Sequence, residues 1–158
     1  MLSGRTFAYK DDTKNGIFKY FYDNYNSQYY DLVKTTASSN NGYAQRALDY
    51  TSNYWHVEDY KGPGSYIIFY LSDYFVKLQG YSITSSNINP ASGICHPKNW
   101  GLDASYDMVK WVHQVNITDD KGEMNKYAST KYFSWSHGTY NVVSPNTGCC
   151  KVSHFLEE

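Results

Sequence analysis

The feature that most constrains the fold is the segment Lys98–Val112 (KNWGLDASYDMVKWV), in which two short stretches of alternating hydrophobicity flank a polar turn at Ser105-Tyr106-Asp107. The larger apolar side chains fall at every second position, which is typical of strands that bury one face. The pattern predicts an antiparallel hairpin with one face directed to the core. Four side chains are expected on that face: Trp100, Leu102, Val109 and Trp111.

Several other segments carry strand patterns. The 18 tyrosines, with seven phenylalanines and four tryptophans, favour strands because broad rings pack well on a pleated surface. Residues Gly62–Leu71 place apolar side chains on both sides, which predicts a central strand. Within Phe75–Ser85, Gly80 indicates a bulge or a close contact, while Gly16–Phe21 fits either a helical turn or a strand. Further strands are expected at Asp31–Ser38, Thr130–Trp135 and Lys151–Glu157.

The whole pattern predicts one fold class. Roughly eight short strands without a convincing long helix indicate an all-β protein, an antiparallel β-sandwich of the jelly-roll kind. No internal repeat or linker divides the 158 residues, so a single domain is expected over residues 1–158. The net charge of −1 lacks the basic surplus of nucleic-acid-binding proteins. No apolar run reaches the roughly 18–20 residues of a spanning helix, so membrane insertion is not expected.

The hairpin segment also resembles a known family. From Trp100 to Trp111 it has the form W-x-L-x-x-S-x-D-x-x-x-W, which is similar to the discoidin domain, also called the coagulation factor V/VIII C-type domain. Ala37-Ser38-Ser39 resembles the end of that family's first core strand, and Pro63–Leu71 and Phe75–Ser85 resemble its next two strands. The resemblance covers about residues 35–155 and implies a galactose-binding-like β-sandwich.

The resemblance implies a ligand site in the loops at one end of the sandwich. Carbohydrate-binding relatives contain a W-H-T-x-Y segment, in which the Trp is in the core and the His donates to a sugar hydroxyl. Trp55-His56 matches this segment, and Tyr60 matches it less closely. A histidine in such a place also caps turns or bonds backbone carbonyls, and this alternative stays open. The expected ligand contacts are His56, Tyr60, His96, Lys98, Asn99, Tyr140 and Asn141.

The resemblance also implies a structural metal ion. Relatives often hold Ca²⁺ in the loop before that tryptophan, and Asp49 and Glu157 stand where its carboxylate ligands are found. Hard oxygen ligands are what Ca²⁺ requires, although an Asp in a loop rich in Ser and Asn also forms turns with its own backbone. A structural calcium ion and a turn formed by Asp49 with its own backbone therefore both stay open, and no other cofactor is expected.

No arrangement of side chains indicates catalysis. Cys95 and His96 are neighbours whose side chains diverge in an extended chain, and the adjacent pair Cys149-Cys150 is poorly spaced for zinc. The same three cysteines predict reduced thiols rather than a disulfide framework. Glu58 and Asp59, side by side, cannot flank one scissile bond. We therefore expect a non-catalytic module.

The expected partner is a glycan or glycoprotein. Aromatic-rich loops that carry Asn, His and Lys supply both stacking faces and hydrogen bonds to hydroxyl groups. An intracellular protein–protein interaction domain is the alternative. The lack of a basic-then-apolar leader and of the disulfide usual in secreted relatives favours a cytoplasmic location, with the cell surface or secretion as the alternative.

Overall fold

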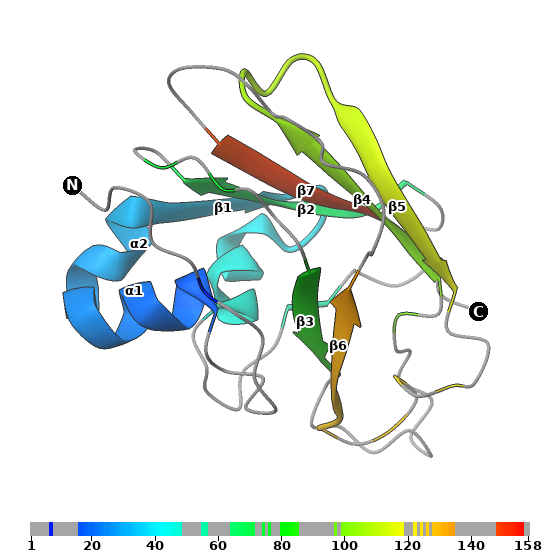
Figure 1. Ribbon diagram of the computed structural model, residues 1–158, viewed down its shortest axis with the longest axis horizontal. Coiled ribbons are helices and arrows are strands. Elements are labelled where there is room, and N and C mark those ends of the chain that lie inside the picture. Colours follow the sequence, from blue (N-terminus) through cyan, green and yellow to red (C-terminus); the bar gives the residue numbers. More distant parts are fainter. Residues whose placement is uncertain are drawn as a thin grey trace.

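The computed structural model describes residues 7, 16–48, 55–56, 64–71, 74, 76, 80–85, 97, 99–118, 122, 124, 126, 128–134 and 148–156, the last range as backbone alone. Strands predominate over helices in this part of the chain, and Figure 1 shows their arrangement. The helices are α1 (Ile17–Tyr25), the 3₁₀ helix η1 (Asn26–Gln28), α2 (Tyr29–Leu32) and the 3₁₀ helix η2 (Asn41–Ala47). The strands are β1 (Val33–Ala37), β2 (Tyr66–Leu71), β3 (Gly80–Thr84), β4 (Asn99–Ser105), β5 (Val112–Thr118), β6 (Thr130–Ser134) and β7 (Gly148–Leu156).

Two antiparallel sheets confirm the prediction of an all-β fold. The main sheet has the strand order β1-β2-β7-β4-β5, and β3 pairs with β6 in a second sheet. Strand β2 lies between β1 and β7, so the predicted central strand is confirmed. The predicted final strand, Lys151–Glu157, is present as β7; it begins earlier, at Gly148, and lies in the middle of the main sheet.

One face of the main sheet carries the hydrophobic core. Alternation along β2 places Ile67, Phe69 and Leu71 on the same face, as predicted. The helices cover this face at one end and the β3–β6 sheet covers it at the other (Figure 1). Two sets of buried residues result, which we call the Trp100 cluster and the Phe21 cluster. The Trp100 cluster contains Ala44, Ile67, Trp100, Leu102 and Met124, and the Phe21 cluster contains Phe21, Tyr29, Val33, Leu48 and Leu71.

The Trp100 cluster joins the two sheets. Trp100 is only 2% exposed, its indole N–H donates to the Tyr81 hydroxyl at 2.7 Å, and its ring meets the edge of Phe133 with centroids 4.9 Å apart. Gly80 permits the close approach of β3 and β6, because a Cβ there would lie 2.2 Å from the Tyr132 hydroxyl oxygen. The close contact predicted for Gly80 is thereby confirmed.

The hairpin is present, but its second half differs from the prediction. Trp100 and Leu102 pair with Ile117 and Val115 of β5, which pack against the Trp100 cluster. The assignment of Val109 to the core face is wrong, since this side chain is 78% exposed. Trp111 is half-buried and precedes the first residue of β5.

The reason for the difference lies in the turn. The Ser105 hydroxyl accepts from the Met108 amide at 3.0 Å, and the Asp107 carboxylate accepts from the amides of Val109 and Lys110 at 2.8 Å each. These side-chain bonds take the place of strand pairing through residues 106–110. The turn is therefore longer than its three most polar residues suggest.

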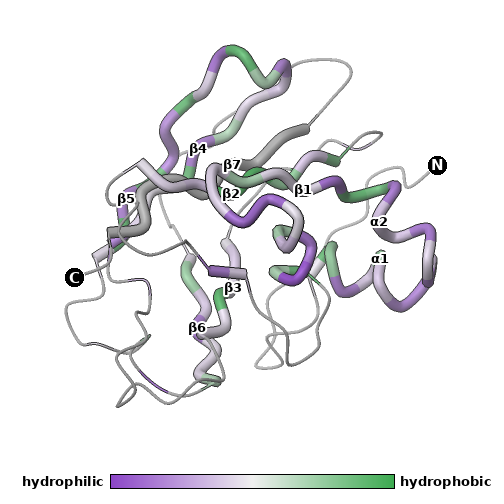
Figure 2. The backbone as a smooth tube through the Cα atoms, turned by 180° about the vertical axis from the view of Figure 1, so that it is seen from behind, coloured by the Kyte–Doolittle hydropathy of each residue, from purple (hydrophilic) through white to green (hydrophobic). Residues whose placement is uncertain are grey.

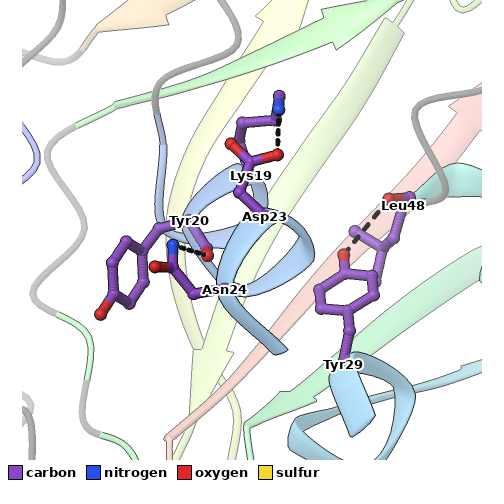
Figure 3. A network of polar contacts seen from close by, with 6 residues as sticks. All are labelled: Lys19, Tyr20, Asp23, Asn24, Tyr29 and Leu48. Carbon is purple, nitrogen blue, oxygen red and sulfur yellow. Dashed lines mark hydrogen bonds and ion pairs between the residues drawn. The ribbon is translucent and has the colours of Figure 1, made fainter. Parts of the chain in front are cut away.

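The Phe21 cluster is built on the segment whose structure the sequence left open. Residues Ile17–Tyr25 form a helix, with Phe21 fully buried and Ile17 and Tyr25 packed against the same cluster at the i, i+4, i+8 spacing of one helical face. Figure 3 shows the polar contacts of this region: Lys19 pairs with Asp23, the Asn24 amide donates to the Tyr20 carbonyl at 2.8 Å, and the buried Tyr29 hydroxyl donates to the Leu48 carbonyl at 3.3 Å.

The remaining strand predictions are borne out in part. Strand β1 lies within the predicted range Asp31–Ser38, and the first two residues of that range belong to α2. Strand β6 lies within the predicted range Thr130–Trp135, and its Phe133 packs against the Trp100 cluster. Trp135 and most of residues 75–79 lie outside the described residues, as does Cys95. In the part of the chain that the structure describes, no helix is long and apolar enough to cross a membrane.

Candidate recognition site at the end of β1

The candidate site begins where the chain leaves β1. The Ser38 amide donates to the Tyr66 carbonyl at 3.0 Å, and the Tyr66 amide donates back to the Ser38 hydroxyl at 2.9 Å, which ties this exit to the start of β2. The Asn41 side chain accepts from the Ala37 amide at 2.8 Å. Asn40 takes the left-handed conformation (φ 49°), which asparagine tolerates better than most residues. These contacts fix a tight turn at one end of the main sheet.

This turn holds the segment Trp55-His56 by direct bonds. The Trp55 indole N–H donates to the Ser39 carbonyl at 2.9 Å, and its half-buried ring packs against the Trp100 cluster. The Asn40 amide lies 3.2 Å from both the carbonyl oxygen and the Nε2 of His56. Trp55 thus has the structural place that the sequence predicts, while His56 is exposed.

The contact with Asn40 determines which nitrogen of the His56 imidazole can donate a hydrogen bond. An amide nitrogen carries two hydrogens, so Asn40 can donate one to the His56 carbonyl and the other to the ring Nε2. In this arrangement Nε2 is the acceptor, and the ring proton is on Nδ1. The neutral ring then has its donor at Nδ1, and a sugar hydroxyl can accept from a donor of this kind.

Asn99 is at the same end of the main sheet. It is the first residue of β4, it is half-buried, and it pairs with Thr118 and Leu156 near the ends of their strands. Its Oδ1 atom is buried and has no hydrogen-bond partner among the described residues. Strands β2 and β7 separate β1 from β4, so Asn99 lies roughly 14 Å across the sheet from the exit of β1 at a spacing of ~4.8 Å per strand.

The structure therefore brings two of the predicted site residues to one end of the sheet without placing them in contact. The other expected ligand contacts, Tyr60, His96, Lys98, Tyr140 and Asn141, lie outside the described residues. The expected calcium ligands, Asp49 and Glu157, lie outside them as well. Among the residues that are described, no group of three or more His, Cys, Asp or Glu side chains could hold a metal ion.

The contribution of Asn40 was missed in the sequence analysis. The signal was present in Asn40-Asn41-Gly42, which is a turn sequence in which asparagine often adopts the left-handed conformation. What the sequence did not supply was the contact between residues 40 and 56, because a separation of 16 residues has no period from which to infer it.

A second exposed surface lies at the far end of the sheet, on the turn between β4 and β5. Its apolar side chains include Met108 (43% exposed) and Val109, and Figure 2 shows hydrophobic positions at this tip. Hydrogen bonds from the amides of Lys110 and then Val109 lower the pKa of Asp107, which is fully exposed. The turn is thus held in shape by a carboxylate and presents apolar groups to solvent.

No model of a known protein family matches the chain, and comparison with curated protein sequences finds no relative.

Proposed function

We propose that the protein is a non-catalytic carbohydrate-recognition domain, and that its ligand contacts the exposed His56 end of a discoidin-like sandwich. The observation that carries the proposal is the geometry of this histidine. Trp55 anchors the segment to the core, and Asn40 fixes the ring so that Nδ1–H is its donor. A donor held in place before binding loses little conformational freedom when a hydroxyl arrives.

The arrangement of the sheets supports the proposal that the fold is a discoidin-like sandwich. A five-stranded antiparallel sheet covered on one face by a smaller antiparallel sheet is compatible with a jelly-roll sandwich of the galactose-binding type. At the same end, the buried Oδ1 of Asn99, which has no partner among the described residues, would accept from a bound water that bridges to a second sugar hydroxyl. A separation of roughly 14 Å between strands β1 and β4 favours an oligosaccharide over a monosaccharide as the ligand.

The proposal is tested by a glycan array followed by calorimetry on the best hit. We expect His56→Ala to weaken binding at least fivefold, since a net hydrogen bond of about 1 kcal/mol corresponds to that factor. His113→Ala is the matched control, because His113 is also exposed but lies on β5, where it pairs with Asp103 at 2.8 Å. Equal affinity in wild type and a folded His56→Ala protein would remove the carbohydrate site from this end of the sheet.

Two further variants distinguish a direct contact between His56 and the sugar from the indirect role of Asn40 in orienting His56. Asn40→Gly keeps a residue suited to positive φ while removing the amide that orients His56, so binding should weaken while thermal stability falls only slightly through the lost hydrogen bonds. His56→Gln keeps an amide that can donate a hydrogen bond to a hydroxyl, so it should retain more of the affinity than His56→Ala.

A protein–protein interaction domain is the second candidate, and the β4–β5 turn is the observation that favours it. The exposed Met108 and Val109 lie on a backbone held by Ser105 and Asp107, which is how a small apolar anchor is presented to a partner. The double variant Met108→Ser, Val109→Ser should leave glycan binding unchanged. If it abolished binding of a purified partner that His56→Ala still bound, the interaction function would take precedence.

A further inference from the structure

A pair of exposed side chains on η2 lies beside the His56 turn and has no role in the site described so far. Tyr43 is 49% exposed, and the guanidinium carbon of Arg46 lies 4.1 Å from the centre of its ring. The Tyr43 amide donates to the Asn40 carbonyl at 2.8 Å, which closes the first turn of the 3₁₀ helix. Asn40 contacts His56, so the pair is joined to the candidate site by a single turn of chain.

The geometry of a 3₁₀ helix explains why these side chains line up. With three residues per turn, side chains at i and i+3 lie one above the other, and successive turns rise by ~6 Å. Tyr43 and Arg46 follow one another at this interval. We call this exposed pair the η2 row. Asn40, which precedes the helix as its N-cap in the left-handed conformation, carries the amide that holds His56.

The η2 row rests on a rigid base. Ala44, between Tyr43 and Arg46, is fully buried in the Trp100 cluster. Leu48, just after the helix, is buried in the Phe21 cluster, and its amide donates to the Gln45 carbonyl at 2.9 Å. The exposed face of η2 is consequently fixed from below at both ends.

Among the described residues around this surface, the permanent charge has one sign. In residues 37–48 and 55–56, Arg46 is the only side chain with a permanent charge. None of the ion pairs found among the described residues includes it. A guanidinium that stacks on a ring keeps its N–H groups directed outward in its own plane, where they match the two oxygens of a carboxylate.

We infer that the η2 row makes the domain selective for acidic glycans, with Arg46 binding the carboxylate of a uronic-acid-type sugar and Tyr43 stacking on the adjoining sugar ring. This inference rests on the proposed carbohydrate function and specifies the class of its ligand. Tyr43 and Arg46 are one turn apart, roughly 6 Å along the 3₁₀ helix, so the stacked sugar and the acidic group belong to adjoining parts of one ligand. A neutral sugar at His56 and an acidic sugar at Arg46 make that ligand a disaccharide or longer.

The test compares three ligands on the full chain by calorimetry: a galactose disaccharide, the matching disaccharide with galacturonic acid at one position, and the methyl ester of that acid. The free acid is expected to bind about tenfold or more tightly than the other two, the factor typical of a charge-assisted hydrogen bond. The preference should fall as salt is raised. Arg46→Gln should abolish the preference while His56-dependent binding of the neutral disaccharide persists.

Matched variants distinguish the guanidinium from charge alone. Arg46→Lys keeps the charge without the planar fork, so it should retain only part of the preference. Lys110→Gln removes an exposed cation at the far end of the sheet and should change nothing. Tyr43→Ala should weaken all three disaccharides alike by removing the stacking face, and thermal melting checks that each variant is folded.

The outcomes separate the two proposals. If all three disaccharides bind equally and His56→Ala weakens them, the inference about acidic glycans is overturned and the carbohydrate function stands. If the preference survives in Arg46→Gln, the assignment to Arg46 is overturned. If a disaccharide bearing a sulfate ester binds more tightly than the uronic acid, the carboxylate is the wrong group. If no glycan binds, both proposals are overturned.

Discussion

The two hydrophobic clusters cover the same face of the main sheet but are built in different ways. The Trp100 cluster joins sheet to sheet, and a buried hydrogen bond from Trp100 to Tyr81 fixes how the layers meet. The Phe21 cluster joins helices to the sheet, mainly through tilted and edge-to-face ring contacts such as those of Phe21 with Tyr74 and Tyr25. Each cluster contains a hydrogen bond of a buried side chain: in the first it joins the two sheets, and in the second it links Tyr29 to the Leu48 carbonyl at 3.3 Å.

Both clusters meet at the element that carries the candidate site. Helix η2 supplies Ala44 to the Trp100 cluster and is followed by Leu48 of the Phe21 cluster, while Phe69 packs against both. The exposed η2 row is therefore supported by the junction of the two. A recognition surface placed there keeps its shape only while both clusters are intact.

The largest expected effect comes from Trp100→Ala. Replacing a buried Trp by Ala typically costs about 3–5 kcal/mol, and here it also leaves the Tyr81 hydroxyl without its partner. We expect a value in the upper part of that range, which is a large share of the stability of an ordinary domain. Chemical denaturation measures it. A folded variant with unchanged stability and lost glycan binding would instead make Trp100 a ligand contact.

Phe21→Ala should cost somewhat less, about 3–4 kcal/mol, because no polar group loses its partner. Denaturation of the same variant also tests whether the two clusters unfold together. The four tryptophans lie outside α1 and α2, so fluorescence reports on the sheets while circular dichroism at helical wavelengths reports on α1. Coincident transitions are expected from a single domain. Separate transitions would divide the molecule at η2.

The contrast between the two clusters also shows which parts of the fold could be predicted from the sequence. The buried positions of Trp100, Leu102 and the β2 side chains could be predicted, because the alternation of apolar residues along a strand indicates which face is buried. The Phe21 cluster was not, since Tyr, Phe and Asn crowd residues 18–30 without a decisive period. Val109 was misplaced because side chains of the turn, not the alternation, decide where β5 begins.

The candidate site was predictable only as single residues. His56 and Asn99 were named through a resemblance, and their position at one end of the sheet depends on strand order, which alternation does not encode. The partner of His56 is 16 residues away, and the η2 row depends on a 3₁₀ rather than an α-helical turn. Neither feature has a hydrophobic pattern that reveals it.

Tyr81→Phe probes the polar contact that distinguishes the Trp100 cluster. The substitution keeps the ring but removes the acceptor for the Trp100 indole N–H, which should cost about 1–3 kcal/mol near neutral pH. Burial raises the pKa of Tyr81 to about 12, against an opposing contribution from the bond with Trp100. In the unfolded chain the phenol ionises near the ordinary tyrosine pKa of 10.0, so wild type loses stability as the pH rises from there toward about 12.

The measurement is a pair of denaturation series at rising pH. The stability advantage of wild type over Tyr81→Phe should be fully present below pH 10 and should shrink above it, because only wild type carries this group. An advantage that stayed constant to pH 12 would mean that the hydroxyl is not protected by the core.

The smallest expected effect lies outside both clusters, in the β4–β5 turn. Hydrogen bonds from the Lys110 amide and then the Val109 amide lower the pKa of Asp107 below its ordinary value of 3.8, and the Ser105 hydroxyl also donates to the carboxylate. Its contribution to stability is therefore present above about pH 4 and is lost as the pH falls through the lowered value.

Because Asp107 is fully exposed, the melting temperature should drop only slightly in Asp107→Ala. It should drop less in Asp107→Asn, because the amide oxygen of asparagine still accepts both bonds. The difference between wild type and Asp107→Asn should vanish in melts at pH values well below that range. A loss as large as that of Phe21→Ala would instead show that the turn, and not the two clusters alone, holds β4 and β5 in the sheet.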